Sequence, residues 1–488
     1  MRQDLTAFEI ERHKAAIIRT DISRPVRLAM NAGLFTESCS FFDYGCGHGG
    51  DIKRLAELGF KTTGWDPYFR PTEKKSQAEV VNLGYVLNVI ENPKERQQAL
   101  MESWSLATRV LIVSAQVLLD YLSNDVVAYG DGVVTKRNTF QKYFEQEELK
   151  NYIDSVLQVD SVPVGLGTYV VFRNPEDAES FKLSRFHSKR STPQIRLKVK
   201  TFEEYENVLK PLMDFVSERG RLPLKGELNT ESNICAEFGS ITRAFKIVLQ
   251  ATSSQEWEEL FERRKQDLLL YVALSKFSKR PKLSDLPNHI KLDLKSLLGS
   301  YKTACELADN ALFSLGQAGY IHKKCAESKI GKLLPDSLYV HLSALDELDL
   351  SLRLYEGCAS RTVGRMDGAT IVKFHTDKPR ISYLFYPDFE TDPHPALHTS
   401  VRIDLQDLHV KYSDYVKSDN PPVLHRKETF LSKSHPLYQQ FAELTKEEED
   451  AGLLDNAKMI GTRAGWEARL RSAEAKIVDH KVVKTSAG

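Results

Sequence analysis

The sequence predicts an α/β domain over residues 1–175, a helical domain over 201–330 and an α+β domain over 331–488, with a basic linker at 176–200. Strand-like and helix-like runs alternate in the first region, which is the pattern of α/β domains. Apolar residues keep helical spacing through the second region. The third region alternates apolar and polar residues in short runs separated by Pro and Asp, which predicts an antiparallel meander.

Length and composition indicate an ordinary soluble protein of several domains. The 488 residues exceed what one hydrophobic core usually spans, and 41% of them are hydrophobic and 27% charged. Because Lys+Arg and Asp+Glu both number 67, the net charge neither favours nor excludes a nucleic-acid partner. The first residues lack the apolar run of a signal peptide, and no apolar stretch reaches membrane-spanning length. We therefore expect a cytoplasmic protein without a membrane partner.

The expected elements follow from the spacing of apolar residues. In the first region the expected strands are Ser40–Tyr44, Thr62–Trp65, Val80–Leu83 and Arg109–Ala115, with a closing hairpin of Val159–Val162 and Thr168–Phe172. The expected helices there are Ile52–Leu58, Pro93–Ala107 and Phe144–Leu157. In the third region we expect strands at Thr370–Phe374, Arg380–Phe385, Val401–Leu405 and Val410–Tyr412, then helices near Leu437–Gly452 and Arg463–Ala475.

A glycine-rich loop, Asp43-Tyr-Gly-Cys-Gly-His-Gly-Gly50, follows the first strand. Its glycines let the backbone approach a nucleotide cofactor closely, and the helix that follows presents a positive dipole end. Asp43 discriminates between cofactors, because a carboxylate repels a pyrophosphate but attracts the cationic amino group and sulfonium of S-adenosylmethionine. Asp66, after the second strand, is placed to accept ribose hydroxyls. We therefore expect a Rossmann-like class I methyltransferase domain, with a nicotinamide cofactor as the alternative.

The third strand ends in a segment, Val80–Ile90, that lies at the edge of the sheet where the methyl group is expected. We expect Asn82 and Tyr85 to be catalytic there, although Asn82 alternatively caps the next helix. Their spacing matches the (Asp/Asn/Ser)-Pro-Pro-aromatic motif of amino-group DNA methyltransferases, but Leu83-Gly84 replaces the prolines. Since no Cys follows a Pro, transfer to nitrogen or oxygen is expected. The expected cofactor-binding residues are Asp43, Gly45, Cys46, Gly47, Gly49, Asp66, Asn82 and Leu83.

The loop after the strand expected at Arg109–Ala115 contains Gly130-Asp-Gly132, followed by basic and aromatic residues. Such glycines are typical of a movable lid. Lysine and arginine hold phosphates, and aromatic rings stack on bases. The expected substrate-binding residues are Lys136, Arg137, Phe140, Lys142, Tyr143 and Arg24. An ordinary solvated loop with its aromatic residues packed inward is the alternative.

The helical region contains a weak internal repeat. Phe238-Gly-Ser-Ile-Thr-Arg-Ala244 and Leu298-Gly-Ser-Tyr-Lys-Thr-Ala304 share a Gly-Ser step with Ala four residues beyond the Ser, and each follows an aromatic residue and a basic turn. This pattern favours tandem helix-turn-helix-like units. The expected nucleic-acid-binding residues are Arg243, Lys246 and Lys302. A plain helical bundle with solvated lysines is the alternative.

No metal site is expected. The six cysteines show no Cys-x-x-Cys spacing, which excludes a zinc ribbon. His394 and His398 are four residues apart, but Pro395 between them argues against one helix presenting both. No carboxylate completes a recognisable ligand set.

Six segments carry a family resemblance that runs over nearly the whole chain. They are Thr20–Pro25, Asp43–Gly47, Gly64–Pro67, Val81–Ile90, Thr139–Gln146 and Asn420–Glu428. Together they resemble the methyltransferase-like proteins associated with bacterial DNA phosphorothioation. The resemblance implies a role beside sulfur modification of the DNA backbone, in a restriction or anti-phage setting. It implies proteins of that system as partners, and it favours DNA over RNA.

One departure from ordinary class I enzymes leaves the function open. Only about a dozen residues separate Asp66 from Val80, where a helix, a strand and a second helix normally fit. The edge that covers the adenine is therefore shortened. We expect a methyltransferase acting on nucleic acid, most simply DNA. The alternatives are an accessory protein that binds cofactor and DNA without transferring methyl groups, and a tRNA or small-molecule methyltransferase.

Overall fold

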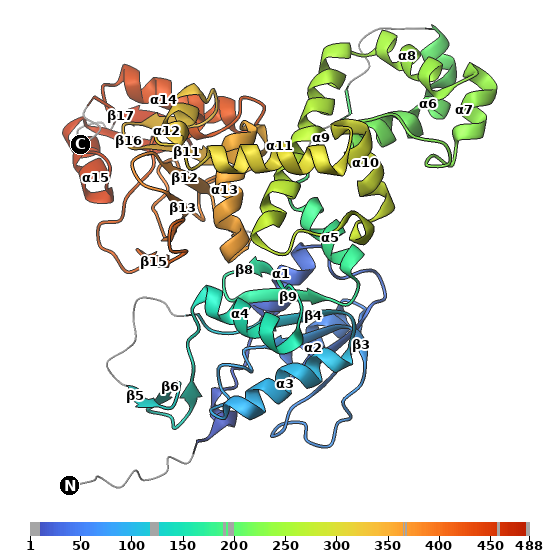
Figure 1. The fold of residues 1–488 in the computed structure, drawn as a ribbon. Coiled ribbons are helices and arrows are strands. Elements are labelled where there is room, and N and C mark those ends of the chain that lie inside the picture. Colours follow the sequence, from blue (N-terminus) through green and yellow to red (C-terminus); the bar gives the residue numbers. More distant parts are fainter. Residues whose placement is uncertain are drawn as a thin grey trace, which may run out of the picture. The chain divides into compact units, whose positions relative to one another are not determined.

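The computed structural model describes residues 10–117, 126–188, 192–193, 200–364, 366, 368–455 and 459–484. The chain divides into two compact units, which Figure 1 shows as ribbons. Unit 1 comprises Met1–Asn174, His322–Leu345 and Glu356–Gly488, and unit 2 comprises Pro175–Ile321 and Asp346–Tyr355. The middle region expected to be contiguous over 201–330 is therefore assembled from two stretches of chain.

The first sheet of unit 1 has six strands in the order β2-β1-β3-β4-β9-β8. Its strands are β1 (Ser40–Tyr44), β2 (Lys61–Trp65), β3 (Ala78–Gly84), β4 (Ala107–Ser114), β8 (Val162–Gly165) and β9 (Thr168–Phe172). The first four are parallel, whereas β9 pairs antiparallel with both β4 and β8. This mostly parallel arrangement confirms the Rossmann-like α/β fold that the sequence predicts.

Four helices accompany this sheet: α1 (Arg24–Asn31), α2 (Gly50–Glu57), α3 (Pro93–Leu106) and α4 (Gln146–Leu157). Helices α3 and α4 contact each other, and their Leu100 and Leu149 join the buried cluster that contains Phe42 and Leu111 of the strands (Figure 1). The strand order reverses at β1, which has β2 on one side and β3 on the other. Ligands of α/β sheets bind at the carboxyl ends of strands beside such a reversal.

The connection from β2 to β3 holds a turn and an isolated bridge between Asp66 and Arg70, with no helix and no further strand. Strand β2 therefore pairs only with β1 and forms the edge of the sheet. This geometry agrees with the shortened connection that the sequence indicates.

A small three-stranded sheet occupies the segment expected to be a movable lid. It contains β5 (Val126–Tyr129), β6 (Gly132–Thr135) and β7 (Phe140–Gln141). Val134 and Phe140 are buried, with exposed fractions of 3% and 0%. Gly130-Asp-Gly132 thus lies at a hairpin turn, because β5 and β6 pair up to Tyr129 and Gly132.

The second large sheet of unit 1 is a meander whose six strands neighbour one another in chain order. They are β10 (Lys332–Leu334), β11 (Ser337–His341), β12 (Ile371–His375), β13 (Arg380–Phe385), β14 (Thr399–Asp404) and β15 (Val410–Asp414). The four alternating runs of the sequence form β12 to β15. Other elements of this part of the chain are α12 (Tyr320–Glu327), α13 (Leu350–Val363), α14 (Tyr438–Asp450), α15 (Arg463–Ser472), β16 (Ala475–Val478) and β17 (Lys481–Lys484).

Unit 2 is helical. Its helices are α5 (Pro175–Ser184), α6 (Lys200–Arg219), α7 (Glu231–Phe238), α8 (Ile241–Ala251), α9 (Ser254–Leu274), α10 (Asn288–Leu298) and α11 (Tyr301–Ser314). Helix α5 lies where a linker was expected, because Phe181 and Leu183 are buried. Of the basic linker residues, Lys189, Arg190, Arg196 and Lys198 lie outside the described residues.

The two copies of the sequence repeat adopt the same local structure. Gly239 and Gly299 end α7 and α10 with φ angles of 76° and 80°, which only glycine adopts readily. The side chains of Ser240 and Ser300 then accept the backbone N–H three residues on and cap α8 and α11. Ala244 and Ala304, four residues beyond each Ser, are fully buried.

Unit 2 also contains a buried charge cluster centred on Asp267. One oxygen of this carboxylate lies 2.6 Å from the Arg353 guanidinium, and the other lies 3.1 Å from that of Arg264. The backbone N–H and hydroxyl of Ser188 also donate to Asp267. Each buried charge is thereby paired, as burial requires.

Candidate functional site

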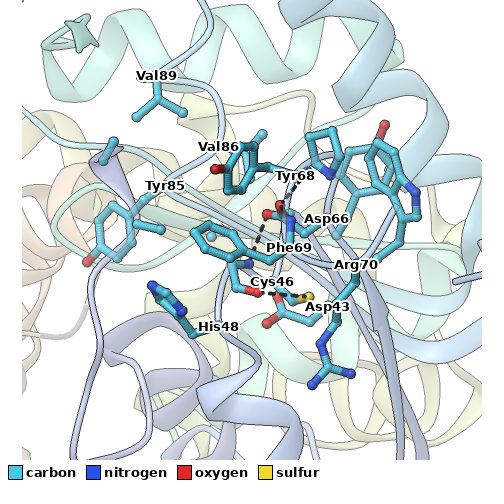
Figure 2. A pocket seen from close by; sticks show the side chains of 18 of the residues that line it. Asp43, Cys46, His48, Asp66, Tyr68, Phe69, Arg70, Tyr85, Val86 and Val89 are labelled. Carbon is cyan, nitrogen blue, oxygen red and sulfur yellow. Dashed lines mark hydrogen bonds between the residues drawn. The ribbon is translucent and has the colours of Figure 1, made fainter. Parts of the chain in front are cut away.

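A cavity of about 1210 Å³ opens at the carboxyl ends of β1, β2 and β3. The last residues of these strands, Tyr44, Trp65 and Gly84, line it, together with the glycine loop and the turn after β2 (Figure 2). Residues from α3 and from the N-terminal segment line it as well. The cavity therefore lies at the reversal of strand order, where the fold predicts a ligand.

The glycine loop needs glycine for geometric reasons. Gly45 and Gly47 have φ angles of 76° and 52°, in the left-handed region. A Cβ atom on Gly45 would stand 2.5 Å from Cγ2 of Val86. Close packing and backbone conformation thus both exclude side chains there, which leaves the backbone accessible to a ligand.

Asp43 and Asn82 meet beneath the loop. They are register partners on the neighbouring strands β1 and β3, and the Asn82 amide donates to the Asp43 carboxylate at 2.8 Å. Both residues line the cavity, although Asp43 is only 5% exposed. The Asn82 amide oxygen is buried without a hydrogen-bond partner among the described residues. The pair thus presents a carboxylate and an unpaired acceptor, which suits an ammonium group with its three donors.

The ionisation of Asp43 depends on what the cavity holds. Burial, together with the charges of Asp51 and Asp66, raises the pKa of this carboxyl to about 7, against the Asn82 hydrogen bond. A cationic ligand would favour the carboxylate and lower its pKa. Burial also raises the pKa of the Cys46 thiol to about 12, so Cys46 is a protonated wall residue at neutral pH.

Asp66 organises the backbone around the cavity. One carboxylate oxygen accepts the Gly47 N–H at 2.9 Å, and the other accepts those of Tyr68 and Phe69, also at 2.9 Å. The sequence predicts Asp66 as the acceptor of ribose hydroxyls. Asp66 does line the cavity, but here it also joins the glycine loop to the turn after β2.

Aromatic contacts that the sequence analysis did not anticipate form one wall of the cavity. Figure 2 shows Phe69 facing His48, and their ring centroids lie 4.2 Å apart. Tyr68 stacks on His13 at 4.1 Å with an interplanar angle of 8°. Tyr85, the predicted catalytic aromatic, follows β3 with φ at 60°, a strained conformation of the kind that clusters at functional sites.

The N-terminal segment Ile10–Ser23 runs along the cavity and is held at both ends. Its Arg12 guanidinium donates to Glu91 at 2.7 Å and to Glu95 at 2.5 Å, both of which also line the cavity. At the other end, the Ser23 N–H donates to Asp51 at 2.7 Å. We call Ile10–Ser23 the strap. Apart from basic residues such as Arg12, Lys14 and Arg19, nothing in the sequence indicates that this segment lines the cavity.

Several predicted substrate residues lie elsewhere, and their expected roles are corrected. The Phe140 ring is fully buried, and Lys142 pairs with Glu148 at 2.8 Å and with Asp131 at 3.4 Å. Arg24 donates to the Leu166 carbonyl instead. None of these three lines the described cavity, nor do Lys136, Arg137 and Tyr143. Phe140 and Lys142 thus pack inward, whereas Lys136 and Arg137 are exposed, and the substrate-binding role of these two and of Tyr143 stays a prediction.

Leu83 also requires a correction. Its side chain is fully buried in the core cluster on the side of α3, and it does not line the cavity. Alternation along β3 explains this, because Asn82 and Leu83 point to opposite faces. The other predicted cofactor-binding residues, Asp43, Gly45, Cys46, Gly47, Gly49, Asp66 and Asn82, all line the cavity.

The predicted nucleic-acid-binding residues belong to unit 2. Arg243 and Lys246 are exposed on α8, and Lys302 is exposed on α11. Their role stays a prediction. Within the described ranges, no group of three or more His, Cys, Asp or Glu is arranged to hold a metal ion. No helix in those ranges is both long and apolar enough to cross a bilayer.

No protein-family model matches the sequence, and a search of curated proteins gives no significant match. Among solved structures, the chain is similar to the 1,6-didemethyltoxoflavin-N1-methyltransferase of Burkholderia thailandensis, whose structure contains 1,6-didemethyltoxoflavin and S-adenosylhomocysteine. The similarity covers 30% of this chain and 74% of that protein, at 14% sequence identity and a TM-score of 0.22. An O-methyltransferase family protein of the same organism matches over 30% of this chain and 55% of its own length, at 12% sequence identity and a TM-score of 0.22. The CcbJ methyltransferase of Streptomyces caelestis matches over 32% of this chain and 92% of its own length, at 12% sequence identity and a TM-score of 0.23. The fold assignment rests on the strand order itself.

Proposed function

We propose that the chain is an S-adenosylmethionine-dependent class I methyltransferase whose acceptor is a nitrogen or oxygen of nucleic acid, most simply DNA. One observation carries the cofactor assignment: Asp43 and Asn82 present a buried carboxylate and an unpaired amide oxygen beneath a loop whose conformation and packing favour glycine. An ammonium group fits this pair, and a pyrophosphate is repelled by it.

The residues that would hold the cofactor follow from the cavity. The amino group fits Asp43 and Asn82, the backbone of Gly45–Gly49 approaches the methionine part, and Asp66 lies where ribose hydroxyls are expected. When bound, S-adenosylmethionine supplies an electrophilic methyl group. The chain's own contribution is to position an acceptor in line with it, which accounts for much of the acceleration in such reactions. Tyr85 at the strand end is our candidate for orienting the acceptor.

Support for DNA and for phosphorothioation partners comes from the six sequence segments and from the exposed Arg243, Lys246 and Lys302. A second function is favoured by one observation, the shortened connection between β2 and β3. With only a turn at this edge, adenine recognition depends on residues such as Tyr68 and Phe69. A weakly bound cofactor would suit an accessory protein that binds DNA without transferring methyl groups.

Two measurements test the proposal. Calorimetry should show that S-adenosylhomocysteine binds, and that Asp66→Ala weakens binding by about 10-fold or more because Asp66 also fixes the Gly47 N–H. Incubation with tritiated S-adenosylmethionine and separate pools of DNA, tRNA and protein should label DNA. Binding without label in any pool would favour the accessory role. An affinity unchanged by Asp66→Ala would contradict the cofactor assignment.

A further inference from the structure

A row of basic side chains crosses the meander sheet of unit 1 from one edge to the other. Directly opposed residues connect all six strands in the sequence Lys332, Tyr339, Lys373, Ser382, Arg402 and Lys411. Directly opposed residues of antiparallel strands project from the same face. With about 4.8 Å between neighbouring strands, the row is about 24 Å long. We call these six residues the basic row.

The rest of the sheet explains why the row faces outward. Its sequence neighbours Val372, Phe374, Val401 and Ile403 point to the opposite face and are fully or almost fully buried. On the row's own face, one flank is covered by an apolar cluster that includes Ile371, Leu384 and Phe430. The other flank is polar, with His375 and the Arg380–Asp404 ion pair. Lys411 is exposed, Lys332, Lys373 and Arg402 are half-buried, and Ser382 between Lys373 and Arg402 is buried.

The two central cations of the row, Lys373 and Arg402, are poorly neutralised by the described residues. The Arg402 guanidinium makes no hydrogen bond or ion pair within the described chain, although Asp404 lies near enough to sense its charge. The closest carboxylate to Lys373 is that of the exposed Asp336, 4.0 Å away. Arg402 stands directly opposite Lys411, and like charges in that position are destabilising.

The neighbouring groups respond to this excess of positive charge. His375 accepts or donates one hydrogen bond with the Ser382 hydroxyl at 3.0 Å. Burial, together with the charges of Lys373 and Arg402, lowers the pKa of His375 to about 4, against the opposing charges of Asp377 and Asp336. The Lys373 ammonium lies 5.1 Å from the centre of the Tyr339 ring, so one aromatic surface accompanies the cations. The row combines charge with an aromatic side chain on a sheet.

We propose that the basic row binds the phosphate backbone of a single strand of nucleic acid. Cations spread over about 24 Å match an extended polyanion better than one compact anion, and such binding releases counterions from each contacted phosphate. Basic tracks with an aromatic residue are the usual means of holding single strands. A phosphate between the directly opposed Arg402 and Lys411 would offset the repulsion between these two cations. This proposal does not depend on methyl transfer.

The test compares two doubly substituted full-length proteins of equal charge. Lys373→Gln with Arg402→Gln removes the centre of the row, and Lys446→Gln with Lys476→Gln removes two exposed lysines outside it. The probe is a fluorescent 20-nucleotide oligodeoxythymidylate, followed by anisotropy across a salt series. The row variant should bind at least 10-fold more weakly at 0.1 M salt, and its salt slope should fall by about 1.4, which is two phosphate contacts at about 0.7 each. The control should stay within about twofold of the wild type.

Three outcomes would overturn the proposal. Equal losses in both variants would mean that only total charge matters. Tighter binding of a duplex of the same length would exclude the single strand as the preferred ligand. A lower melting temperature in the row variant would show that these cations stabilise the fold, whereas relief of the like-charged pair predicts an equal or higher one. Calorimetric S-adenosylhomocysteine binding, measured in the same variants, should be unchanged, which separates this test from that of the cofactor.

Discussion

Asp43 is the residue on which the chemistry of the cavity depends. A carboxyl that is 5% exposed and close to two other carboxyls is costly to ionise. Its Asn82 partner relieves only part of this cost, because the amide donates one hydrogen bond. A bound cation would supply the missing favourable interaction. Ligand binding and proton release are therefore linked at this residue.

The first prediction concerns pH. Since the pKa of Asp43 is about 7 without a ligand and lower beside a cation, the affinity for S-adenosylhomocysteine should rise as the pH increases from 6 to 8. Asp43→Asn should abolish this rise and weaken binding at pH 8 by about 10- to 100-fold. Calorimetry in buffers of different ionisation enthalpy measures both the affinity and the proton released.

Thermal melting gives the control for this variant. A raised pKa means that Asp43 favours the folded state at low pH and costs stability as the pH rises through 7. Asp43→Asn should therefore melt at a higher temperature than the wild type at pH 8. A lower melting temperature together with weaker binding would point to misfolding instead of a lost charge.

Individual site residues were predictable from the sequence where their position along a strand determines whether they reach the cavity. Asp43 and Asn82 end neighbouring strands, so their meeting follows from the parallel sheet. Leu83 and Phe140 were assigned wrongly, because local composition does not tell which face of an element meets the core. The stacking of His13 on Tyr68 joins positions far apart in the sequence, and no local pattern indicates it.

Among the elements, the strap has the clearest consequence for ligand exchange. Arg12 fixes the first part of the strap to Glu91 and Glu95, and we call these two contacts the Arg12 fork. The fork holds the strap beside the cavity. Charge-assisted contacts of this kind weaken with salt when partly exposed. Arg12 therefore joins the strap to Glu91 and to Glu95 of α3 beside the cavity.

The second prediction follows for Arg12→Gln. Loss of the fork should increase the dissociation rate of S-adenosylhomocysteine by about 3- to 10-fold at low salt, and high salt should speed dissociation from the wild type in the same way. Stopped-flow fluorescence measures these rates. Lys14→Gln is the matched control, since the carboxylate that pairs with Lys14 in the described part of the chain is that of Glu11, within the strap itself. If Lys14→Gln has the same effect, the fork is not what retains the ligand.

The third prediction treats the two Gly-Ser turns as equivalent. Ser240→Ala and Ser300→Ala should each lower the free energy of unfolding by about 1 kcal/mol, because each removes a helix N-cap. Ser232→Ala and Ser296→Ala, at exposed positions of the preceding helices, should cost little. Urea denaturation followed by circular dichroism compares the four variants. Unequal costs for the two caps would argue that the repeat is only a likeness of sequence.

Elements were predictable from the sequence where apolar spacing is regular. The parallel strands and α3 appear within a few residues of their expected bounds. The three-stranded sheet that replaces the expected lid was not predictable, because β5 and β6 are short and the burial of Val134 and Phe140 depends on the folded structure. Helix α5 was missed for a related reason, since the basic residues after it suggested a solvated linker.

For the whole molecule, buried histidines set the response to acid. Burial lowers the pKa of His341, His375 and His425 to about 4 and that of His394 to about 3. In the unfolded chain they bind protons near pH 6.5, so the stability they contribute above that pH is lost as the pH falls toward 4. Asp43 and Glu448, whose pKa values are raised to about 7, stabilise the folded state as the pH falls, but these two groups are outnumbered by the four histidines.

The fourth prediction is that the melting temperature of unit 1 falls between pH 7 and pH 5 by at least about 5 °C. His394→Gln should flatten this dependence, because it removes one of the buried groups that must gain a proton on unfolding. The exposed His409→Gln should leave the slope unchanged. Differential scanning calorimetry at several pH values measures the slopes, and parallel slopes in all three proteins would refute the assignment.

The pairing of Arg353 with Asp267 determines how the helical unit can be divided. Asp267 lies in the long stretch Pro175–Ile321, whereas Arg353 belongs to the short stretch Asp346–Tyr355. A fragment truncated at Ile321 would lose one of the two guanidinium groups that neutralise a carboxylate buried to 1% exposure. Losing a partner of this kind costs about 3–5 kcal/mol, which is much of the stability of a typical domain. A gene fusion, deletion or domain exchange that is meant to keep the helical unit folded should therefore carry both stretches together.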